Sequence, residues 1–312
     1  MLVFEQSIAG VLVILCLIIV GYVIAPWFDA KSTRLLAKLV TQISLPCYMI
    51  DTIVAKFDAK SLLQMLPDLR YPILSMLVLM VVALILSVCF KIDTTKRGLF
   101  ISMFFNSNTV FIGLPINQAL FGDKSIPYVL IYYMANTTLF WTLGNYFIQK
   151  DAQLKLKFDL KNTLKKIFSP PLLGFMLGIV LVLSKISLPD FLAQDLMYLG
   201  NLTIPLSMLF IGISVKQAGL NKLHLGKENL LVILGRFVCA PILMYLLLYN
   251  VSMPSLMKQV FVLQSAMPVM TNAPVVAKLY DADADYAAVM VTETTLLSLI
   301  IVPILMIIIQ SL

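Results

Sequence analysis

Long apolar segments, each sufficient to cross a bilayer as a helix, recur along the whole chain. A transmembrane helix needs about 20 consecutive apolar residues, and charged residues make up only 12% of this chain. A water-soluble domain of this length would not carry such a composition. The sequence therefore predicts an all-α polytopic membrane protein with ten transmembrane helices, spans 1 to 10, at residues 5–27, 33–55, 69–90, 98–121, 126–149, 169–188, 194–215, 229–250, 257–280 and 285–311.

The basic residues predict how the spans are oriented. Cytoplasmic loops close to span ends are enriched in Lys and Arg, and with ten spans 16 of the 23 basic residues fall on one side. We therefore expect a multi-pass protein of the cell membrane, in contact with membrane lipid and with both termini outside. The net charge of +7 is explained by this topology, so no nucleic-acid partner is expected. The four cysteines are widely spaced without a CxxC pair, and no metal site is predicted.

Two spans are interrupted near their centres by polar residues, glycine and proline. In span 4 the break contains Asn106, Asn108 and Gly113 and ends at Pro115, and in span 9 it occupies 268–274. Backbone can leave the helical conformation at membrane depth only inside protein or beside water. Broken helices at corresponding positions of two halves are typical of the binding sites of secondary transporters.

One offset relates several features of the two halves. Pro46 and Pro205 are 159 residues apart, and so are Pro115 and Pro274. Each half then holds five spans, an odd number, so the second half enters the membrane inverted relative to the first. We predict a first five-helix repeat at 1–149, a cytoplasmic amphipathic linker at 150–168 and an inverted second repeat at 169–312, with the broken spans 4 and 9 crossing.

The crossing is predicted to bind a carboxylate. Pro115 and Pro274 can each begin a second half-helix, since proline suits the first turn of a helix, and two inward N-termini attract an anion. Gly113 would allow the backbones to approach closely. Alternatively, the polar groups serve only to satisfy the backbone freed by the breaks. The predicted substrate-binding residues are Asn106, Asn108, Thr109, Gly113, Pro115, Pro268, Thr271, Asn272 and Pro274.

Charged side chains inside spans are functional candidates because they are costly in a membrane. Arg236 lies about two turns inside span 8, so we expect it to reach the cytoplasmic interface or, alternatively, to steer or bind an anion. Glu293 lies roughly 12 Å deep in span 10. It is either a proton-coupling carboxylate or a group hydrogen-bonded by the neighbouring threonines or the broken backbone. Lys278 is a further candidate for assisting charge, and Asp51 is expected to be interfacial.

The segments 108–116 and 266–280 resemble the auxin efflux carrier family, whose bacterial members include permeases for malate and malonate. The similarity covers the whole chain in length and number of spans. The resemblance implies a scaffold of spans 1, 2, 6 and 7 and a transport domain of spans 3–5 and 8–10 that moves as an elevator. It also implies that the substrate carboxylate sits at the crossing, where the family's asparagine matches Asn108 and its second-break proline region matches 268–274.

We therefore expect a secondary transporter of small organic anions such as malate or malonate, with no cofactor and no enzyme activity. Coupling to a sodium or proton gradient is left open, and so is a homodimer formed through the scaffold helices. The alternative is a sodium- or proton-coupled symporter or antiporter of the bile-acid or cation-exchanger kind with a different substrate. Such carriers typically place acidic side chains at the crossing, and these are missing from both breaks here.

Overall fold

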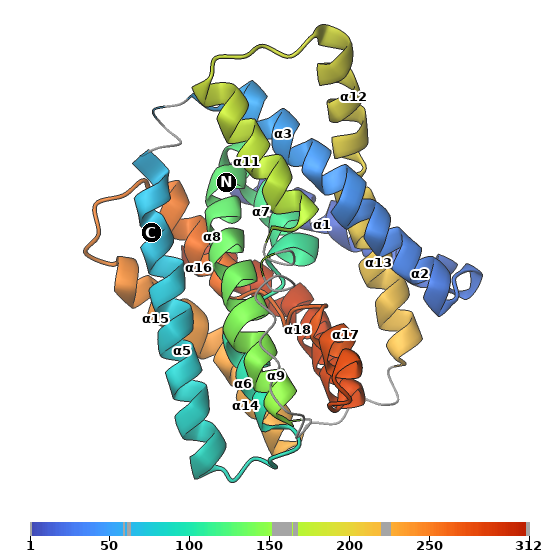
Figure 1. Cartoon of the computed structure of the whole chain (residues 1–312), viewed down its shortest axis with the longest axis vertical. Coiled ribbons are helices and arrows are strands. Elements are labelled where there is room, and N and C mark those ends of the chain that lie inside the picture. Colours follow the sequence, from blue (N-terminus) through green and yellow to red (C-terminus); the bar gives the residue numbers. More distant parts are fainter. Residues whose placement is uncertain are drawn as a thin grey trace.

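The computed structural model describes residues 2–58, 60, 64–151, 164, 168–219 and 226–309 (Figure 1). Throughout these residues the chain forms helices and turns, without strands. Most of the predicted linker at 150–168 lies outside the described residues. The helices are α1 (Leu2–Ile24), α2 (Ala30–Leu39), α3 (Leu45–Lys56), α5 (Arg70–Cys89), α6 (Arg97–Phe105), α7 (Leu114–Phe121), α8 (Ile126–Leu139), α9 (Asn145–Asp151), α11 (Pro170–Leu183), α12 (Asp190–Asn201), α13 (Thr203–Ala218), α14 (Lys227–Leu234), α15 (Ala240–Leu248), α16 (Ser255–Ser265), α17 (Ala273–Leu279) and α18 (Ala284–Ile309).

Several helical segments of the described part have the length and composition of membrane spans. Five are long and apolar enough to cross a bilayer, and they coincide with predicted spans 3, 4, 7, 8 and 10: Leu66–Cys89, Arg97–Phe121, Asp190–Gln217, Lys227–Leu248 and Ala284–Met306. Two shorter apolar helices, Leu12–Trp27 and Pro170–Leu183, lie in spans 1 and 6. An all-helical polytopic membrane protein fits these segments, while the number of ten spans stays a prediction.

The bounds of several helices follow the 159-residue offset. Shifted by this offset, α5 falls on α14–α15, α6 on α16 and α8–α9 on α18, to within two residues at each end. The helices after the two breaks differ, because α17 has only seven residues whereas the first break is followed by helix over 109–121. The inverted orientation of the two halves stays a prediction.

α5 is apolar on all sides. Leu79 and Ala83 are buried, while Val81, Ile85 and Val88 are half or more exposed. In water, a helix with this distribution would expose a large apolar face to solvent. The exposed side chains are therefore suited to contact with lipid.

Widened helical turns precede three prolines. Proline lacks an N–H group and its ring collides with the carbonyl four residues earlier. Here the turn before each proline opens to a π-helical turn, and the helix continues. These turns are Val40–Ser44 before Pro46, Thr109–Gly113 before Pro115 and Gly235–Cys239 before Pro241.

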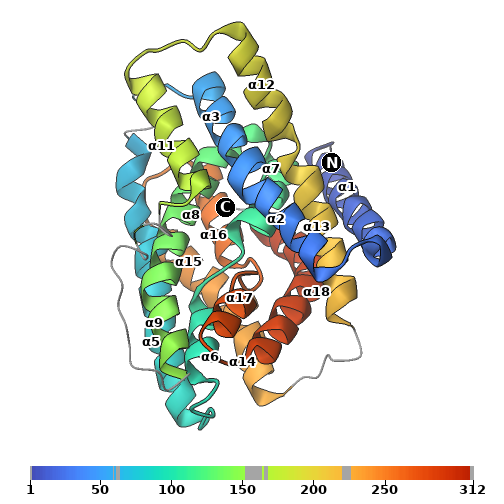
Figure 2. The ribbon, with the colours of Figure 1, turned by 45° about the vertical axis from the view of Figure 1, so that its right-hand side comes forward.

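The helices gather into two groups (Figure 2). In the first group α1 packs against α13, and α3 packs against α11 and α12. In the second group α5 packs against α6, α8 and α15, α6 against α9 and α14, α15 against α16, and α17 against α18. The first group corresponds to predicted spans 1, 2, 6 and 7, and the second contains the two broken helices. We call them the α1–α13 group and the crossing group.

Two glycines allow α1 and α13 to pack closely. A Cβ atom on Gly212 would lie 2.0 Å from the carbonyl oxygen of Ile18, and one on Gly21 would lie 2.4 Å from that of Leu209. Both distances are far below van der Waals contact. A larger residue at either position must therefore push the two helices apart.

We expect Gly212→Val to lower the apparent melting temperature of the detergent-solubilised protein by about 5 °C, because overpacking of this contact destabilises the folded state. Gly226→Val is the matched control, since a Cβ atom on Gly226 meets nothing closer than 3.4 Å. Thermal unfolding of the purified variants measures both effects. Equal melting temperatures for the two variants would contradict the close packing of α1 on α13.

Candidate functional site

The two breaks meet and are joined by hydrogen bonds. The backbone N–H of Asn108 donates to the carbonyl oxygen of Pro268 at 2.8 Å. The Ser107 hydroxyl donates to the carbonyl of Gln264 at 3.2 Å, and Nε2 of Gln264 donates to the carbonyl of Thr109 at 3.3 Å. The interruptions in spans 4 and 9 thus form one crossing.

The helix after the first break begins at Thr109, six residues before Pro115. Asn108 is its N-cap, and Oδ1 of Asn108 accepts a hydrogen bond of 3.1 Å from the backbone N–H of Phe111. The π-helical turn that follows leads directly into α7, so Pro115 lies inside the helix. The prediction that Pro115 begins this half-helix is therefore wrong. Asparagine is a strong capping residue, and the widened turn accommodates the proline.

At the second break the helix begins as predicted. Pro274 lies in the first turn of α17, after the N-cap residue Asn272. A side chain of α18 satisfies part of the broken backbone: the N–H of Val269 donates to Oγ1 of Thr294 at 3.1 Å. The neighbouring Glu293 is buried and accepts a hydrogen bond of 2.8 Å from Nδ2 of Asn229 in α14.

Asn136 in α8 holds the backbone of the first break. Its Oδ1 accepts from the N–H of Ser107 at 2.9 Å, and its Nδ2 donates to the carbonyl of the same residue at 2.8 Å. The side chain is completely buried. One amide thus satisfies both backbone groups of Ser107, and a lipid environment requires that such freed groups be satisfied inside the protein. Asn136 is not among the residues predicted from the sequence, although an asparagine within an apolar span is a usable signal.

Arg236 is fully buried and binds the backbone of both broken helices. Its Nη1 donates to the carbonyl of Phe104 at 3.1 Å, and Nε and Nη2 donate to that of Met267 at 3.1 and 3.0 Å. Nη2 also donates to the carbonyl of Ser265. The expectation that Arg236 reaches the membrane interface is therefore wrong. The last carbonyls of a helix have no partner within the helix, and the guanidinium binds those of α6 and α16.

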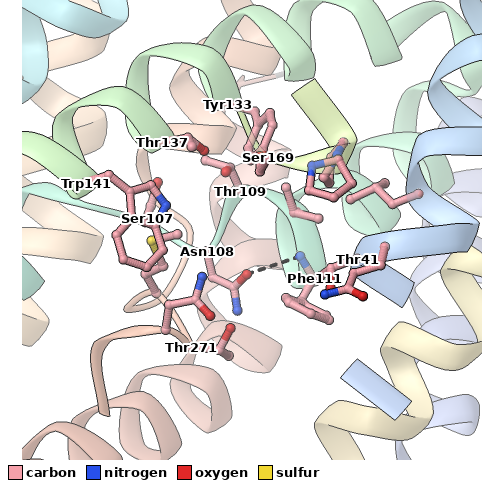
Figure 3. Close-up of a pocket in the computed structure, with 17 residues that line it drawn as sticks. Thr41, Ser107, Asn108, Thr109, Phe111, Tyr133, Thr137, Trp141, Ser169 and Thr271 are labelled. Carbon is pink, nitrogen blue, oxygen red and sulfur yellow. Dashed lines mark hydrogen bonds between the residues drawn. The ribbon is translucent and has the colours of Figure 1, made fainter. Parts of the chain in front are cut away.

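A cavity of about 300 Å³ lies beside the crossing (Figure 3). Both breaks contribute to its wall, as do α8 with the turn that follows it and the α1–α13 group. The lining residues are Ser107, Asn108, Thr109, Val110 and Phe111 from the first break, Met270, Thr271 and Asn272 from the second, Tyr133, Thr137 and Trp141 from α8 and its following turn, and Thr41, Gln42, Leu45, Ser169, Pro170 and Pro171 from the α1–α13 group. The cavity therefore lies between the two groups of helices.

Two polar atoms of cavity-lining residues are buried without a partner, Oγ1 of Thr137 and Nδ2 of Asn108. Asn108 is only 2% exposed, and its Nδ2 forms no hydrogen bond. Its Oδ1 caps the helix, so the amide is fixed with its donor unused. A buried unpaired donor is unfavourable by about 1–3 kcal/mol. An acceptor atom of a ligand in the cavity would remove that cost.

The predicted binding residues divide into two sets. Four of them line the cavity: Asn108, Thr109, Thr271 and Asn272. The other five lie at the breaks outside its wall: Asn106, Gly113, Pro115, Pro268 and Pro274. Lys278 is exposed in the last turn of α17 and does not line the cavity.

Gly113 and Asn106 of the second set contact the broken helices. A Cβ atom on Gly113 would lie 2.3 Å from Oε1 of Gln264. Gly113 therefore admits a side chain of the other broken helix, whereas we had expected its backbone to approach. Asn106 bonds its own helix, since its Nδ2 donates to the carbonyl of Ser102 at 3.1 Å.

Asp151 lies beyond predicted span 5 and caps the start of α6. Its Oδ1 and Oδ2 accept from the backbone N–H groups of Gly98 and Leu99 at 2.6 and 2.7 Å. Burial raises the pKa of the Asp151 carboxyl to about 6, against the opposing effect of these two donors and of Arg97, while Asp93 raises it slightly. The cap of the first broken helix therefore titrates near neutral pH.

We expect the Asp151 carboxyl to make thermal stability depend on pH. Its pKa in the folded protein lies above the ordinary value of 3.8. Its contribution to the stability of the folded protein is therefore complete below about pH 3.8 and is lost as the pH rises through about 6. The difference in melting temperature between native protein and Asp151→Asn should fall over this interval and be constant above about pH 7. Asp93→Asn is the control, because backbone and side-chain hydrogen bonds from Thr95 lower the pKa of Asp93. A difference independent of pH for Asp151→Asn would contradict the assignment.

Comparison with known proteins relates the chain to membrane transporters. The model of a family described as membrane transport protein matches residues 6–306. An uncharacterized transporter of Methanocaldococcus jannaschii is 26% identical over 302 residues, which cover 94% of this chain and 95% of that protein. An uncharacterized transporter of Methanothermobacter thermautotrophicus is 26% identical over 200 residues, 63% of each chain. Because the family match covers nearly the whole chain, the protein belongs to the membrane transport protein family, which is the auxin efflux carrier family that its broken spans resemble.

Proposed function

We propose that the protein is a secondary transporter of small organic anions and that the cavity beside the crossing binds the substrate carboxylate. Family membership supports transport across a membrane. The observation that supports an anion is the buried, unpartnered Nδ2 of Asn108 in the cavity wall. This donor lies at the N-terminus of the helix over 109–121, where backbone N–H groups and the helix dipole also favour negative charge.

The remaining wall suits a small carboxylate. Hydroxyl groups of Thr109 and Thr271 supply further donors, and Tyr133 and Trp141 supply aromatic surface. The cavity volume of about 300 Å³ is at the lower end of the range for small-molecule sites. Mono- or dicarboxylates of the size of malate or malonate are the proposed substrates.

The position of the cavity supports an elevator-type mechanism. Its wall is divided between the α1–α13 group, through residues such as Thr41 and Ser169, and the crossing group, through both breaks. We propose that the crossing group moves across the cell membrane against the α1–α13 group, with both termini outside. Dimerisation through the α1–α13 group belongs to the same proposal. Proton coupling, if present, would depend on the buried Glu293, and sodium coupling on oxygen atoms at the breaks.

Binding can be measured through Trp141. The chain has two tryptophans, and Trp27 is 80% exposed, so Trp27→Phe leaves Trp141 in the cavity wall as the single tryptophan. We expect malate, malonate or a monocarboxylate of similar size to change its emission saturably, and the corresponding neutral amide to bind more than about tenfold more weakly.

The matched variants are Asn108→Ala, which should lose this response, and Asn250→Ala, which removes an exposed asparagine and should keep it. Equal binding of acids and amides, or no response to any acid in a screen of mono- and dicarboxylates, would remove the organic-anion assignment. Membership of the transporter family would be unaffected by either result.

A further inference from the structure

We propose that Arg236 determines the sign of the charge that the cavity attracts, although its side chain does not line the cavity. This inference rests on the proposed function and deepens it, because it names the group that makes the cavity selective for anions. It follows from the helix ends that meet at the crossing and from the contacts of the guanidinium.

The helix ends at the crossing compensate one another. The C-terminal ends of α6 and α16 meet the N-terminal ends of α17 and of the helix that begins at Thr109. A helix N-terminus carries roughly half a positive charge, and a C-terminus roughly half a negative charge. Two of each add to about zero, so the broken helices alone give no net attraction for an anion. An anion site predicted from the two inward N-termini alone leaves out the opposite charge of the two C-termini.

Arg236 changes this balance. Its guanidinium, which carries a full positive charge in proteins, donates to Phe104 in the last turn of α6, to Ser265 at the end of α16 and to Met267 in the second break. The negative helix ends are thereby compensated. The two positive helix ends, one of them beside Asn108, are left without a compensating charge, and together they add to about one net positive charge.

Within the part of the chain that the structure describes, Arg236 has no carboxylate partner, because each of its hydrogen bonds goes to a backbone carbonyl. Glu293 in α18 accepts a bond from Asn229, which lies two helical turns before Arg236 in span 8. The 159-residue offset places Leu77 at the equivalent position of the first half. Arg236 is therefore not hydrogen-bonded to a carboxylate of the described chain, and one carboxylate group of a ligand would balance its charge.

Quenching of Trp141 tests the proposal without a known substrate. In the Trp27→Phe protein, iodide, caesium and acrylamide probe the cavity with a negative, a positive and a neutral quencher, at constant ionic strength since salt screens charge. The ratio of the iodide to the caesium quenching constant is compared with that of free N-acetyltryptophanamide. We expect the native ratio to exceed the free one by about threefold or more.

The variants separate charge from structure. Arg236→Lys keeps the charge and should retain the ratio to within about twofold, whereas Arg236→Gln should reduce it to the value of the free fluorophore. Acrylamide quenching should be the same in all of them. Lys278→Gln, which removes an exposed cation at the far end of α17, is the control and should behave as native protein.

Three results would overturn the proposal. One is a native ratio equal to that of the free fluorophore, which needs no variant and therefore holds even if Arg236→Gln does not fold. Another is a parallel change of the quenching constants of all three quenchers in Arg236→Gln, which would mean that Arg236 has only a structural role. The last is an iodide-to-caesium ratio that falls to the value of the free fluorophore in a folded Arg236→Lys protein. An Arg236-dependent ratio without binding of any carboxylate would support the inference and remove the proposed substrate class, so the two failures are distinguishable.

Discussion

Replacing Arg236 by glutamine should lower the apparent melting temperature of the detergent-solubilised protein by about 5 to 15 °C. The substitution leaves the carbonyls of Phe104, Ser265 and Met267 short of donors inside the protein. Each buried unsatisfied group destabilises by about 1–3 kcal/mol, and glutamine can replace at most part of the guanidinium fork. Arg236→Lys should fall between glutamine and the native residue, because an ammonium group provides charge and donors without the planar geometry.

Thermal unfolding followed by intrinsic fluorescence provides the measurement. Lys278→Gln removes an exposed cation and serves as the control. A melting temperature of Arg236→Gln within about 2 °C of the native value would mean that the guanidinium does not hold the two helix ends together.

Replacing Asn136 by leucine should have an effect of similar size and also abolish transport. Leucine has nearly the shape of asparagine but leaves the N–H and the carbonyl of Ser107 unpaired, which costs about 2–6 kcal/mol. Ser107 and the following residue Asn108 line the cavity, and both are bonded to the other broken helix. We therefore expect a lower melting temperature together with loss of the Trp141 binding response.

Asn250→Leu, at an exposed position, controls for the change of residue type in the Asn136 experiment. The two readouts are recorded on the same preparation. An Asn136→Leu protein that melts and binds like Asn250→Leu would show that Ser107 does not depend on Asn136.

The hydrogen bonds at the crossing favour the proposed movement of the crossing group as one body. Asn136 joins α8 to the first break, Gln264 joins α16 to it, and Arg236 joins α14–α15 to both. These bonds lie within the crossing group. A rigid movement of that group would preserve them all, whereas separation of the two breaks would expose several backbone groups. The proposed rigid-body movement would therefore cost less than separation of the two breaks.

The sequence was most informative where the local pattern decides the structure. Polar and proline residues inside an apolar span predicted both breaks. Asn108 was predicted as a binding residue because it stands at the break itself. The start of the first half-helix was predicted at Pro115 because proline suits a first turn. The helical backbone begins at Thr109 instead, because the side chain of Asn108 caps it and accepts a hydrogen bond from a backbone donor, which a proline side chain cannot do.

Long-range contacts were beyond the sequence. Arg236 binds backbone carbonyls that every residue possesses, one of them 132 positions away at Phe104. No residue type marks such an acceptor, so snorkelling to the interface was the natural expectation. The cavity wall was incomplete for the same reason. Thr41, Trp141 and Ser169 lie in three other spans and reach the crossing only through tertiary packing.

Uptake into proteoliposomes tests the central claim most directly. Vesicles loaded with unlabelled malate or malonate should exchange it for the labelled acid when they contain native protein or Asn250→Ala. Vesicles with Asn108→Ala should retain less than about a tenth of that rate, because the substitution removes the unpartnered amide donor in the cavity wall. Asn108→Ala protein that folds and exchanges at the native rate would contradict the account, as would native protein that exchanges no carboxylate from a wider panel.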